Sequence, residues 1–319
     1  MRVFILLVLL GLIYTPAAKA DEYRNLLGAF KALPKEATNP ENKITPEKVA
    51  LGKKLYMETA LSKANDISCN SCHGLDSFGV DNKPVSPGHK GQTGDRNSPT
   101  VYNAALHIAQ FWDGRAKDVE EQALGPILNP IEMAMDSEEE VIKRLSASKE
   151  YPALFKKAFP EDKEPLTYKN LGKAIGAFER TLLTPSPFDA YIEGDDKALS
   201  KEQKEGLKTF VSVGCTTCHN GVAVGGGMYQ KLGLVVPYDT DDLGRYNVTK
   251  NEFEKYFFKV PSLRNIEKTG PYFHDGSVKT IDEAISLMAK HQLGKDLAKE
   301  DVAKIITFLT SLTGEIPKQ

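Results

Sequence analysis

Residues 69–73 read Cys-Asn-Ser-Cys-His, and residues 215–219 read Cys-Thr-Thr-Cys-His. Each stretch is a C-x-x-C-H motif, which is typical of c-type haem attachment because two thiols at this spacing can bond to the two vinyl groups of one haem. The histidine beside them can then bind the haem iron as its proximal ligand. The motifs predict two covalently bound haems, the first held by Cys69, Cys72 and His73 and the second by Cys215, Cys218 and His219.

Two other interpretations of a C-x-x-C spacing are a thioredoxin-like redox pair and half of a zinc site. A redox pair does not require the histidine that follows, and a four-cysteine zinc site does not require two histidines. The chain has four cysteines, all of them in the two motifs, so none remains for a disulfide framework. Haem attachment is therefore the preferred interpretation of both motifs.

The segments before the two motifs are similar to each other. Residues 45–47 (Thr-Pro-Glu) supply an N-cap, a proline and an acid for the first turn of a helix. Residues 200–203 (Ser-Lys-Glu-Gln) form a capping box before a second helix. The sequence therefore predicts an internal repeat of a helix followed by a haem site. The matching positions are Gly52, Lys54 and Tyr56 in the first copy and Gly206, Lys208 and Phe210 in the second.

The rest of the chain alternates between helical patterns and irregular stretches, with little strand pattern. Residues 66–100 are rich in glycine, proline and asparagine and predict a long loop, which in a compact domain is usually functional. The predicted fold class is mainly α, with two cytochrome c-like haem domains and long irregular loops. Further helices are expected over residues 115–125, 136–146, 167–182, 281–290 and 297–312.

The first 20 residues resemble a secretory signal peptide. They contain an early arginine, an apolar run over residues 3–13 and an Ala-Lys-Ala cleavage site at 18–20. This predicts a periplasmic protein, in agreement with c-type haem attachment outside the cytoplasm. No other apolar run is long enough to span a membrane, so we expect no stable membrane span.

We divide the remaining chain into an N-terminal haem domain, residues 21–184, and a C-terminal haem domain, residues 185–319. The proline-rich residues 184–188 form the expected junction. We also consider packing of the last helix on the N-terminal domain. The formal net charge is −2, so the chain lacks the basic excess expected of a nucleic-acid-binding protein, and nucleic acid is not an expected partner.

The sixth ligand of each iron decides the chemistry that the haem can perform. His89 lies in a Ser-Pro-Gly-His-Lys-Gly stretch, residues 86–91, whose glycines allow the loop to change conformation. Met288 lies on the expected helix over residues 281–290, where a cytochrome c fold usually supplies its axial methionine. Methionine raises the iron potential relative to a second histidine, so one chain could carry a high-potential and a low-potential haem.

Several further phrases occur in a fixed order along the chain. With the haem motifs, they make the chain resemble the bacterial dihaem cytochrome c peroxidases over nearly the whole mature length. The phrases are Arg-Asn-Ser-Pro-Thr at 96–100, Gln-Phe-Trp-Asp-Gly-Arg at 110–115, Ile-Glu-Met at 131–133, Pro-Tyr-Phe-His-Asp-Gly at 271–276 and Gln-Leu-Gly-Lys at 292–295.

The resemblance implies a division of labour between the haems. The N-terminal haem would react with peroxide, with His89 as its removable distal ligand. The C-terminal haem, with Met288, would be the high-potential haem that receives electrons. Glu132 would shuttle protons with Gln122 beside it as a hydrogen-bond partner of peroxide, and Trp112 would lie between the haems.

The resemblance also implies the reaction and the partners. Hydrogen peroxide would be reduced to water with electrons from a small c-type cytochrome or a cupredoxin, and the family commonly forms homodimers. One calcium ion is expected between the domains, bound by Asn97 and the backbone carbonyls of Thr269 and Pro271, because calcium prefers oxygen ligands. The remaining histidines are expected to be structural, with their hydrogen bonds satisfied: His107, His274 and His291.

Two alternative functions remain open. One is a non-catalytic dihaem electron carrier, in which both irons keep two protein ligands in every redox state. The other is a dihaem maturation oxidase that acts on a protein substrate. A related branch of this second kind, which matures a tryptophan-derived quinone cofactor, has tyrosine in the place of the axial methionine, and Met288 argues against it.

Overall fold

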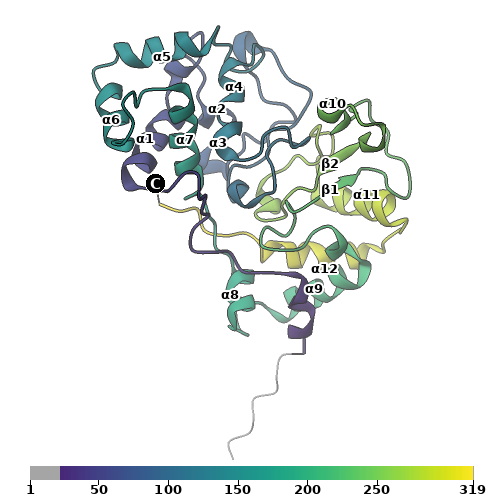
Figure 1. Cartoon of the computed structure of the whole chain (residues 1–319). Helices are drawn as coiled ribbons and strands as arrows, with labels where there is room; N and C mark the ends of the chain where they lie inside the picture. The colour runs from purple at the N-terminus through teal and green to yellow at the C-terminus, as the bar shows by residue number, and fades with distance from the viewer. Residues whose placement is uncertain (1–21, 319) are drawn as a thin grey trace, which may run out of the picture.

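The computed structural model describes residues 22–318, so the predicted signal peptide lies outside the described residues. The chain forms two helical lobes joined by loops, with α1 to α7 in one lobe and α8 to α12 in the other (Figure 1). The α-helices are α1 (Pro46–Tyr56), α2 (Cys69–Cys72), α3 (Val119–Gln122), α4 (Gly125–Leu128), α5 (Glu138–Ala147), α6 (Tyr151–Ala158), α7 (Tyr168–Glu179), α8 (Pro187–Glu193), α9 (Lys201–Val213), α10 (Tyr246–Thr249), α11 (Ile281–Leu293) and α12 (Lys299–Thr310).

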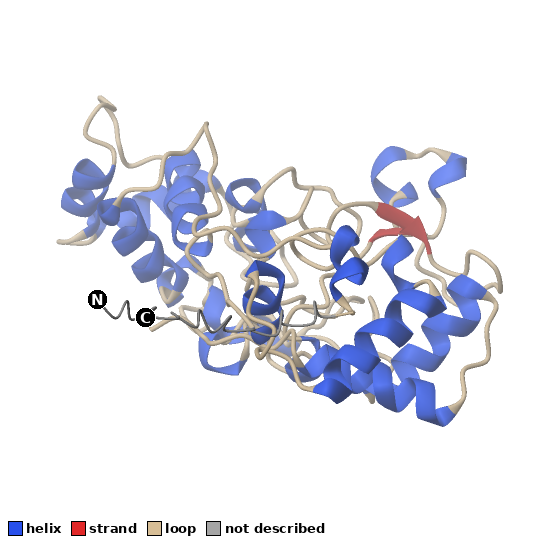
Figure 2. Ribbon diagram, turned by 90° about the horizontal axis from the view of Figure 1, so that it is seen from below, coloured by secondary structure: helices blue, strands red, loops and turns tan. Residues whose placement is uncertain are grey.

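One two-stranded sheet is the only sheet in the described residues. Strands β1 (Tyr229–Lys231) and β2 (Phe257–Lys259) pair antiparallel, with Gln230 opposite Phe258. Loops fill the region between the two groups of helices (Figure 2). The mainly α class expected from the sequence is confirmed, and no helix within residues 22–318 is long and apolar enough to cross a membrane.

The predicted helix starts before both haem motifs are present. The Thr45 hydroxyl accepts a hydrogen bond from the backbone N–H of Lys48 and caps α1. Ser200 and Gln203 form the predicted capping box at the start of α9. Both caps satisfy N–H groups that the first turn of a helix leaves without an intrahelical partner.

The internal repeat extends from sequence to packing. Helix α1 crosses α7, and α9 crosses α12, each at one of the matched glycines. A Cβ atom on Gly52 would lie 1.9 Å from the carbonyl oxygen of Ala174, and one on Gly206 would lie 2.2 Å from that of Lys304. Each glycine therefore lets two helix backbones approach more closely than any side chain would allow.

Two buried apolar clusters form the cores of the lobes. The first is built mainly from α1, α5, α6 and α7, and the second from α8, α9 and α12. The last helix packs on α9, not on the N-terminal lobe as we considered, because Ile305 and Phe308 are buried in the second cluster.

Each end of the described chain reaches the opposite lobe. The 3₁₀ helix η1 (Arg24–Ala29) contacts α9, and Phe30 packs edge-on against Phe188 with ring centroids 5.2 Å apart. Residues 22–33, which the sequence division assigned to the N-terminal domain, thus lie with the C-terminal core. At the other end, Ile316 packs against the first cluster, beside α1 (Figure 1).

Three expectations about individual elements differ from the structure. Of the helix expected over residues 115–125, only the single turn α3 is present, and a separate turn, α4, begins at Gly125 with Pro126 in its first turn. Helix α6 was not predicted, although Pro152 in its first turn is a helix-start signal. The expected junction at residues 184–188 already contains the start of α8, which Ser186 caps.

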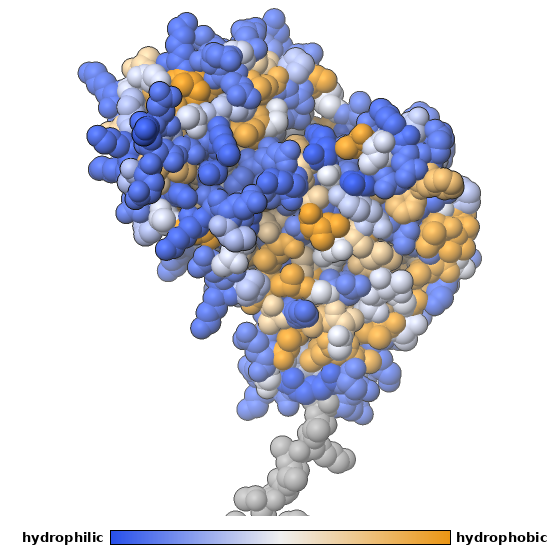
Figure 3. Space-filling model, in the orientation of Figure 1, coloured by the Kyte–Doolittle hydropathy of each residue, from blue (hydrophilic) through white to orange (hydrophobic). Residues whose placement is uncertain are grey.

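The surface of the two lobes differs in character. The lobe of α8 to α12 carries more apolar residues on the face shown in Figure 3 than the lobe of α1 to α7. Leu234 and Val235, in the loop after β1, are 53% and 56% exposed. The backbone of this loop is attached to the end of α11, since the Leu234 N–H donates to Gln292 Oε1 at 2.9 Å and the Val235 N–H donates to the His291 carbonyl at 3.0 Å.

Candidate active site: two haem cavities with a shared wall

The first C-x-x-C-H motif forms a single helical turn. Cys69 and Cys72 are the first and last residues of α2, so their thiols, three residues apart, lie on one face of the turn. Ser68 caps the turn, and the hydroxyl of Tyr56 donates to the His73 carbonyl at 2.6 Å. Both thiols are free, as covalent haem attachment requires.

His73 is suited to bind iron from one side of the cavity. Burial lowers the pKa of His73 and keeps its imidazole neutral, which is the form that ligates metals. The Nδ1 atom is buried without a hydrogen bond of ordinary geometry, while the carbonyls of Gly79 and Pro99 face the ring. The Pro99 carbonyl is therefore placed to orient the His73 ring.

The second motif repeats this arrangement in the other lobe. Cys215 and Cys218 are also free thiols, and burial lowers the pKa of His219 to about 4. The Nδ1 atom of His219 is buried without a partner, and the carbonyls of Val224 and Pro261 face the ring. The two cavities therefore carry the same donor set, and the residues present fit two haems.

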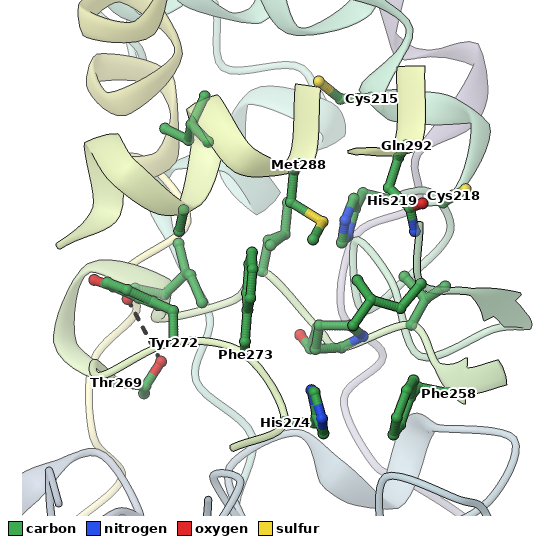
Figure 4. Close-up of a pocket in the computed structure, with 18 of the residues that line it drawn as sticks. Cys215, Cys218, His219, Phe258, Thr269, Tyr272, Phe273, His274, Met288 and Gln292 are labelled. Carbon is green, nitrogen blue, oxygen red and sulfur yellow. Dashed lines mark hydrogen bonds between the residues drawn. The ribbon is translucent and has the colours of Figure 1, made fainter. Parts of the chain in front are cut away.

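Met288 lies in the C-terminal cavity. It extends from α11, and its thioether points into the cavity that also contains the His219 ring (Figure 4). Apolar residues of α11 and the neighbouring loop, including Ile285 and Phe273, line the same cavity. This arrangement fits an iron held between a histidine and a methionine.

The N-terminal cavity is lined by acidic side chains, which the described lining of the C-terminal cavity lacks. Glu132 and Gln122 line it together with Cys72 and His73. Burial raises the pKa of Glu132, and the charge of Arg115 and a hydrogen bond with Asn129 oppose this effect without cancelling it. A carboxyl group with a raised pKa holds its proton more readily than an exposed one and can exchange it with a bound substrate.

Trp112 lies in the wall that the two cavities share. It lines both of them, as do Asn97, Ser98, Pro99 and Thr100. The indole Nε1–H donates to the Asn97 carbonyl at 2.9 Å, which fixes the orientation of the ring. An aromatic side chain therefore lies between the two cavities.

Comparison with known proteins agrees with this geometry. A family profile described as di-haem cytochrome c peroxidase matches residues 46–197. The chain is 46% identical to the cytochrome c551 peroxidase of Pseudomonas aeruginosa over 95% of this chain and 90% of the relative. It is 49% identical to the enzyme of the same name from Nitrosomonas europaea, over 89% of this chain and 84% of that one.

The chain belongs to the di-haem cytochrome c peroxidase family. The family shares its fold with a MauG-like protein associated with microbial copper homeostasis, whose crystal structure matches with a TM-score of 0.79 and 27% identity over 89% of this chain and 94% of that one. A more distant relative is the methylamine utilization protein MauG of Methylorubrum extorquens, 35% identical over 84% of this chain and 77% of the relative. Membership of the di-haem family gives this chain two haems.

In this di-haem peroxidase, His89 does not line either cavity. Its ring lies near Asp136, whose pKa is lowered first by Lys63 and also by the nearby His89. The His89 backbone N–H donates to the carbonyls of Ile131 and Glu132, at 2.9 and 2.8 Å. The loop of the predicted distal ligand is therefore attached to the segment that carries the predicted proton shuttle.

A chain of ion pairs that the sequence did not reveal connects the lobes of the di-haem peroxidase. Arg96 makes a bidentate pair with Asp242, at 2.6 and 2.9 Å, and its third nitrogen contacts Asp113 at 2.6 Å. Asp113 also pairs with Arg115, whose guanidinium lies 3.4 Å from the centre of the Phe111 ring. The sequence signal for Arg115 was its place in the phrase at 110–115, to which we gave no separate role.

The three histidines expected to be structural do not behave alike. His274 contacts the Thr240 hydroxyl at 3.2 Å, and His291 Nδ1 lies 2.9 Å from the Val236 carbonyl, so both have partners. His107 differs, because its Nε2 atom is buried without a partner and its ring lines the C-terminal haem cavity. The expectation of a satisfied structural histidine is therefore wrong for His107.

Proposed function

We propose that this cytochrome c peroxidase reduces hydrogen peroxide to water at its N-terminal haem with electrons received at its C-terminal haem. The observation that carries the proposal is the difference between the two cavities. One brings Glu132 and Gln122 beside His73, and the other brings Met288 beside His219. When bound, the haems supply one-electron chemistry and, in the N-terminal cavity, a position for peroxide.

The protein's part in the reaction falls to the polar residues of the N-terminal cavity. Glu132 accepts a proton from one oxygen of peroxide and delivers a proton to the other, for which its raised pKa suits it. Gln122 donates a hydrogen bond to the bound peroxide, and the Arg115 guanidinium favours negative charge on the departing oxygen.

We further propose that His89 alternates between the cavity and its present place near Asp136. The loop is suited to such a change because Lys90 and Gly91 both have positive φ angles, 56° and 73°. Gly88 packs on the Ile131 carbonyl, to which an added Cβ would lie within 2.1 Å. The His89 loop and the segment that carries Glu132 are thus in direct contact, and we propose that release of His89 and positioning of Glu132 occur together.

Electrons would enter through the apolar surface formed by Leu234 and Val235. Both residues are more than half exposed, and their backbone N–H groups donate hydrogen bonds to the end of α11, whose Gln292 lines the C-terminal cavity. Exposed apolar residues at the edge of a redox site suit brief contact with a small partner. A small c-type cytochrome or a cupredoxin is the proposed donor.

A calcium ion is proposed where the lobes meet. Asn97, Thr269 and Pro271 all line the C-terminal cavity. The Asn97 amide nitrogen donates to the carbonyls of Lys83 and Pro84, at 2.9 and 3.2 Å, so its oxygen remains available as a ligand. Oxygen ligands of this kind suit calcium, and water would complete its coordination.

The remaining assignments follow the family resemblance. We propose cleavage of residues 1–20, a periplasmic location and a homodimeric enzyme. We also propose that the two haem units meet near residue 184, with the exchange of chain ends described above. The two buried clusters support two units, and the matched crossings at Gly52 and Gly206 support their common origin.

The test of function is peroxide-dependent oxidation of a reduced small c-type cytochrome by the purified holoenzyme. A peroxidase oxidises two cytochromes for each peroxide consumed. A plain electron carrier exchanges electrons with the donor but leaves peroxide intact, and that result would refute the proposal. Met288→His should keep both haems attached and lower turnover with this donor, because a second histidine lowers the haem potential.

A further inference from the structure

Lys259, the last residue of β2, is a buried cation without an anionic partner. It is 6% exposed, and burial lowers its pKa to about 8. No aspartate or glutamate within residues 22–318 forms an ion pair with it. Its Nζ atom instead lies 3.4 Å from Nδ1 of His107.

His107 reaches Lys259 from the other lobe, through a close contact that the backbone prepares. A Cβ atom on Gly226 would lie 2.4 Å from the imidazole Cδ2 atom, so only glycine leaves room for the ring. The Ile108 N–H donates to the Gly226 carbonyl at 2.9 Å and holds the loop in place. Because Nδ1 accepts from Lys259, Nε2 carries the hydrogen, and this donor is buried without a partner.

Both donors line the C-terminal haem cavity. Among the described residues that line it, Lys259 is the only lysine or arginine, and no aspartate or glutamate is present. An ammonium and an imidazole N–H therefore meet in a cavity without a protein anion to receive them. A buried charge of this kind is stable only when it is paired.

We propose that Lys259, positioned by His107, binds a propionate carboxylate of the C-terminal haem and raises that haem's reduction potential. A haem brings two carboxylates into a cavity whose described lining has Lys259 as its one lysine or arginine and no acidic residue. A hydrogen bond between an ammonium group and a carboxylate is one of the stronger hydrogen bonds in proteins. The ammonium also favours the reduced iron, which carries one positive charge less than the oxidised iron. This inference rests on the proposed role of the C-terminal haem as the site that receives electrons.

The test is a redox titration of each haem in the holoenzyme of Lys259→Met. The C-terminal haem should become at least tenfold easier to oxidise, a downward shift of about 59 mV for one electron. Lys231→Met is the matched control, since Lys231 ends the partner strand β1 but is exposed, and its charge is screened by water. Lys259→Arg keeps the charge and should restore most of the parental potential.

The titration also separates this proposal from the proposed function. An unchanged C-terminal potential in Lys259→Met, or a shift equal to that of Lys231→Met, would overturn the propionate contact even if the parent reduces peroxide. The expected shift would support the contact even if the parent does not. If Lys259→Met loses its C-terminal haem, the same titration is made on His107→Phe. A downward shift of the C-terminal haem potential in His107→Phe supports the proposal, and an unchanged potential overturns it.

Discussion

Burial raises the pKa of the Glu132 carboxyl group by more than the nearby positive charge of Arg115 lowers it, which favours the protonated form relative to an exposed glutamate. Replacing Glu132 with glutamine keeps the size of the side chain and removes the exchangeable proton. The rate of reaction with peroxide should fall by roughly 10²–10⁴-fold, while the haem content is unchanged. Stopped-flow mixing of the electron-loaded enzyme with peroxide measures this rate, and the exposed Glu161→Gln serves as control. Parental rates in Glu132→Gln would assign the proton shuttle to another group.

His89 permits a second prediction about a single residue. Because the structure keeps its ring outside the cavity, His89→Gly should remove the proposed ligand of the oxidised enzyme without disturbing the packing around the haem site. The oxidised variant should show a high-spin N-terminal haem by electron paramagnetic resonance and react with peroxide before any reduction. A low-spin N-terminal haem in the oxidised variant would contradict the alternation of His89.

Single residues also show how far the sequence can predict a site. The motif cysteines and histidines and Glu132 belong to short local phrases, Met288 was marked by its place on an expected helix, and Gln122 by the family resemblance. All of these residues line one of the two cavities. Lys259 and His107 belong to none of the sequence phrases described above. They belong to segments about 150 residues apart, and their role appears only when β2 and the His107 loop are packed together.

At the scale of helices, the two matched crossings make a prediction about stability. Gly206→Ala places a methyl group 2.2 Å from the Lys304 carbonyl, which forces α9 and α12 apart. The free energy of unfolding should fall by about 1–3 kcal/mol, as is typical of overpacking. Denaturant unfolding of the holoenzyme measures it. Gly28→Ala, where an added Cβ meets nothing within 4 Å, should change little, and an equal loss in both variants would argue against the crossing as the cause.

The helices were predicted well where a cap and a periodic pattern coincide. Both signals mark α1 and α9, whose starts lie at the predicted residues. They fail at residues 115–125, where the structure has only the single turn α3 and then a second short helix, α4, that begins at Gly125. They also fail at α6, which has no side-chain N-cap and is held mainly by burial of Phe155 and Tyr151. Packing, which a single sequence does not display, decides such elements.

For the whole molecule, a buried ion pair in the C-terminal lobe predicts a dependence of stability on pH. Asp189 accepts from the Leu33 N–H and makes two 2.8 Å hydrogen bonds with the fully buried Arg264. Burial raises the pKa of Asp189, but the hydrogen bonds and charge of Arg264 outweigh burial, and the net pKa is lowered. Such a carboxyl stabilises the fold above its unfolded pKa of about 3.9, and this stability is lost as the pH falls through the lower, folded value.

Asp189→Asn tests this contribution. At pH 7 the free energy of unfolding should fall by about 3–5 kcal/mol, because Arg264 is left buried without its anion. Over the acid range the variant should lose less further stability than the parent. Denaturant unfolding as a function of pH measures both effects, with the exposed Asp296→Asn as control. An equally steep acid dependence in Asp189→Asn would assign it to other carboxyl groups.

The exchange of chain ends determines when either lobe can be completed. Phe30 lies near the start of the described chain, yet the core that receives it includes Phe308 of α12, near its end. Domains usually fold as units, the N-terminal one first. Here the N-terminal segment stays without its binding site until almost the whole chain is available, so neither lobe is finished before the other.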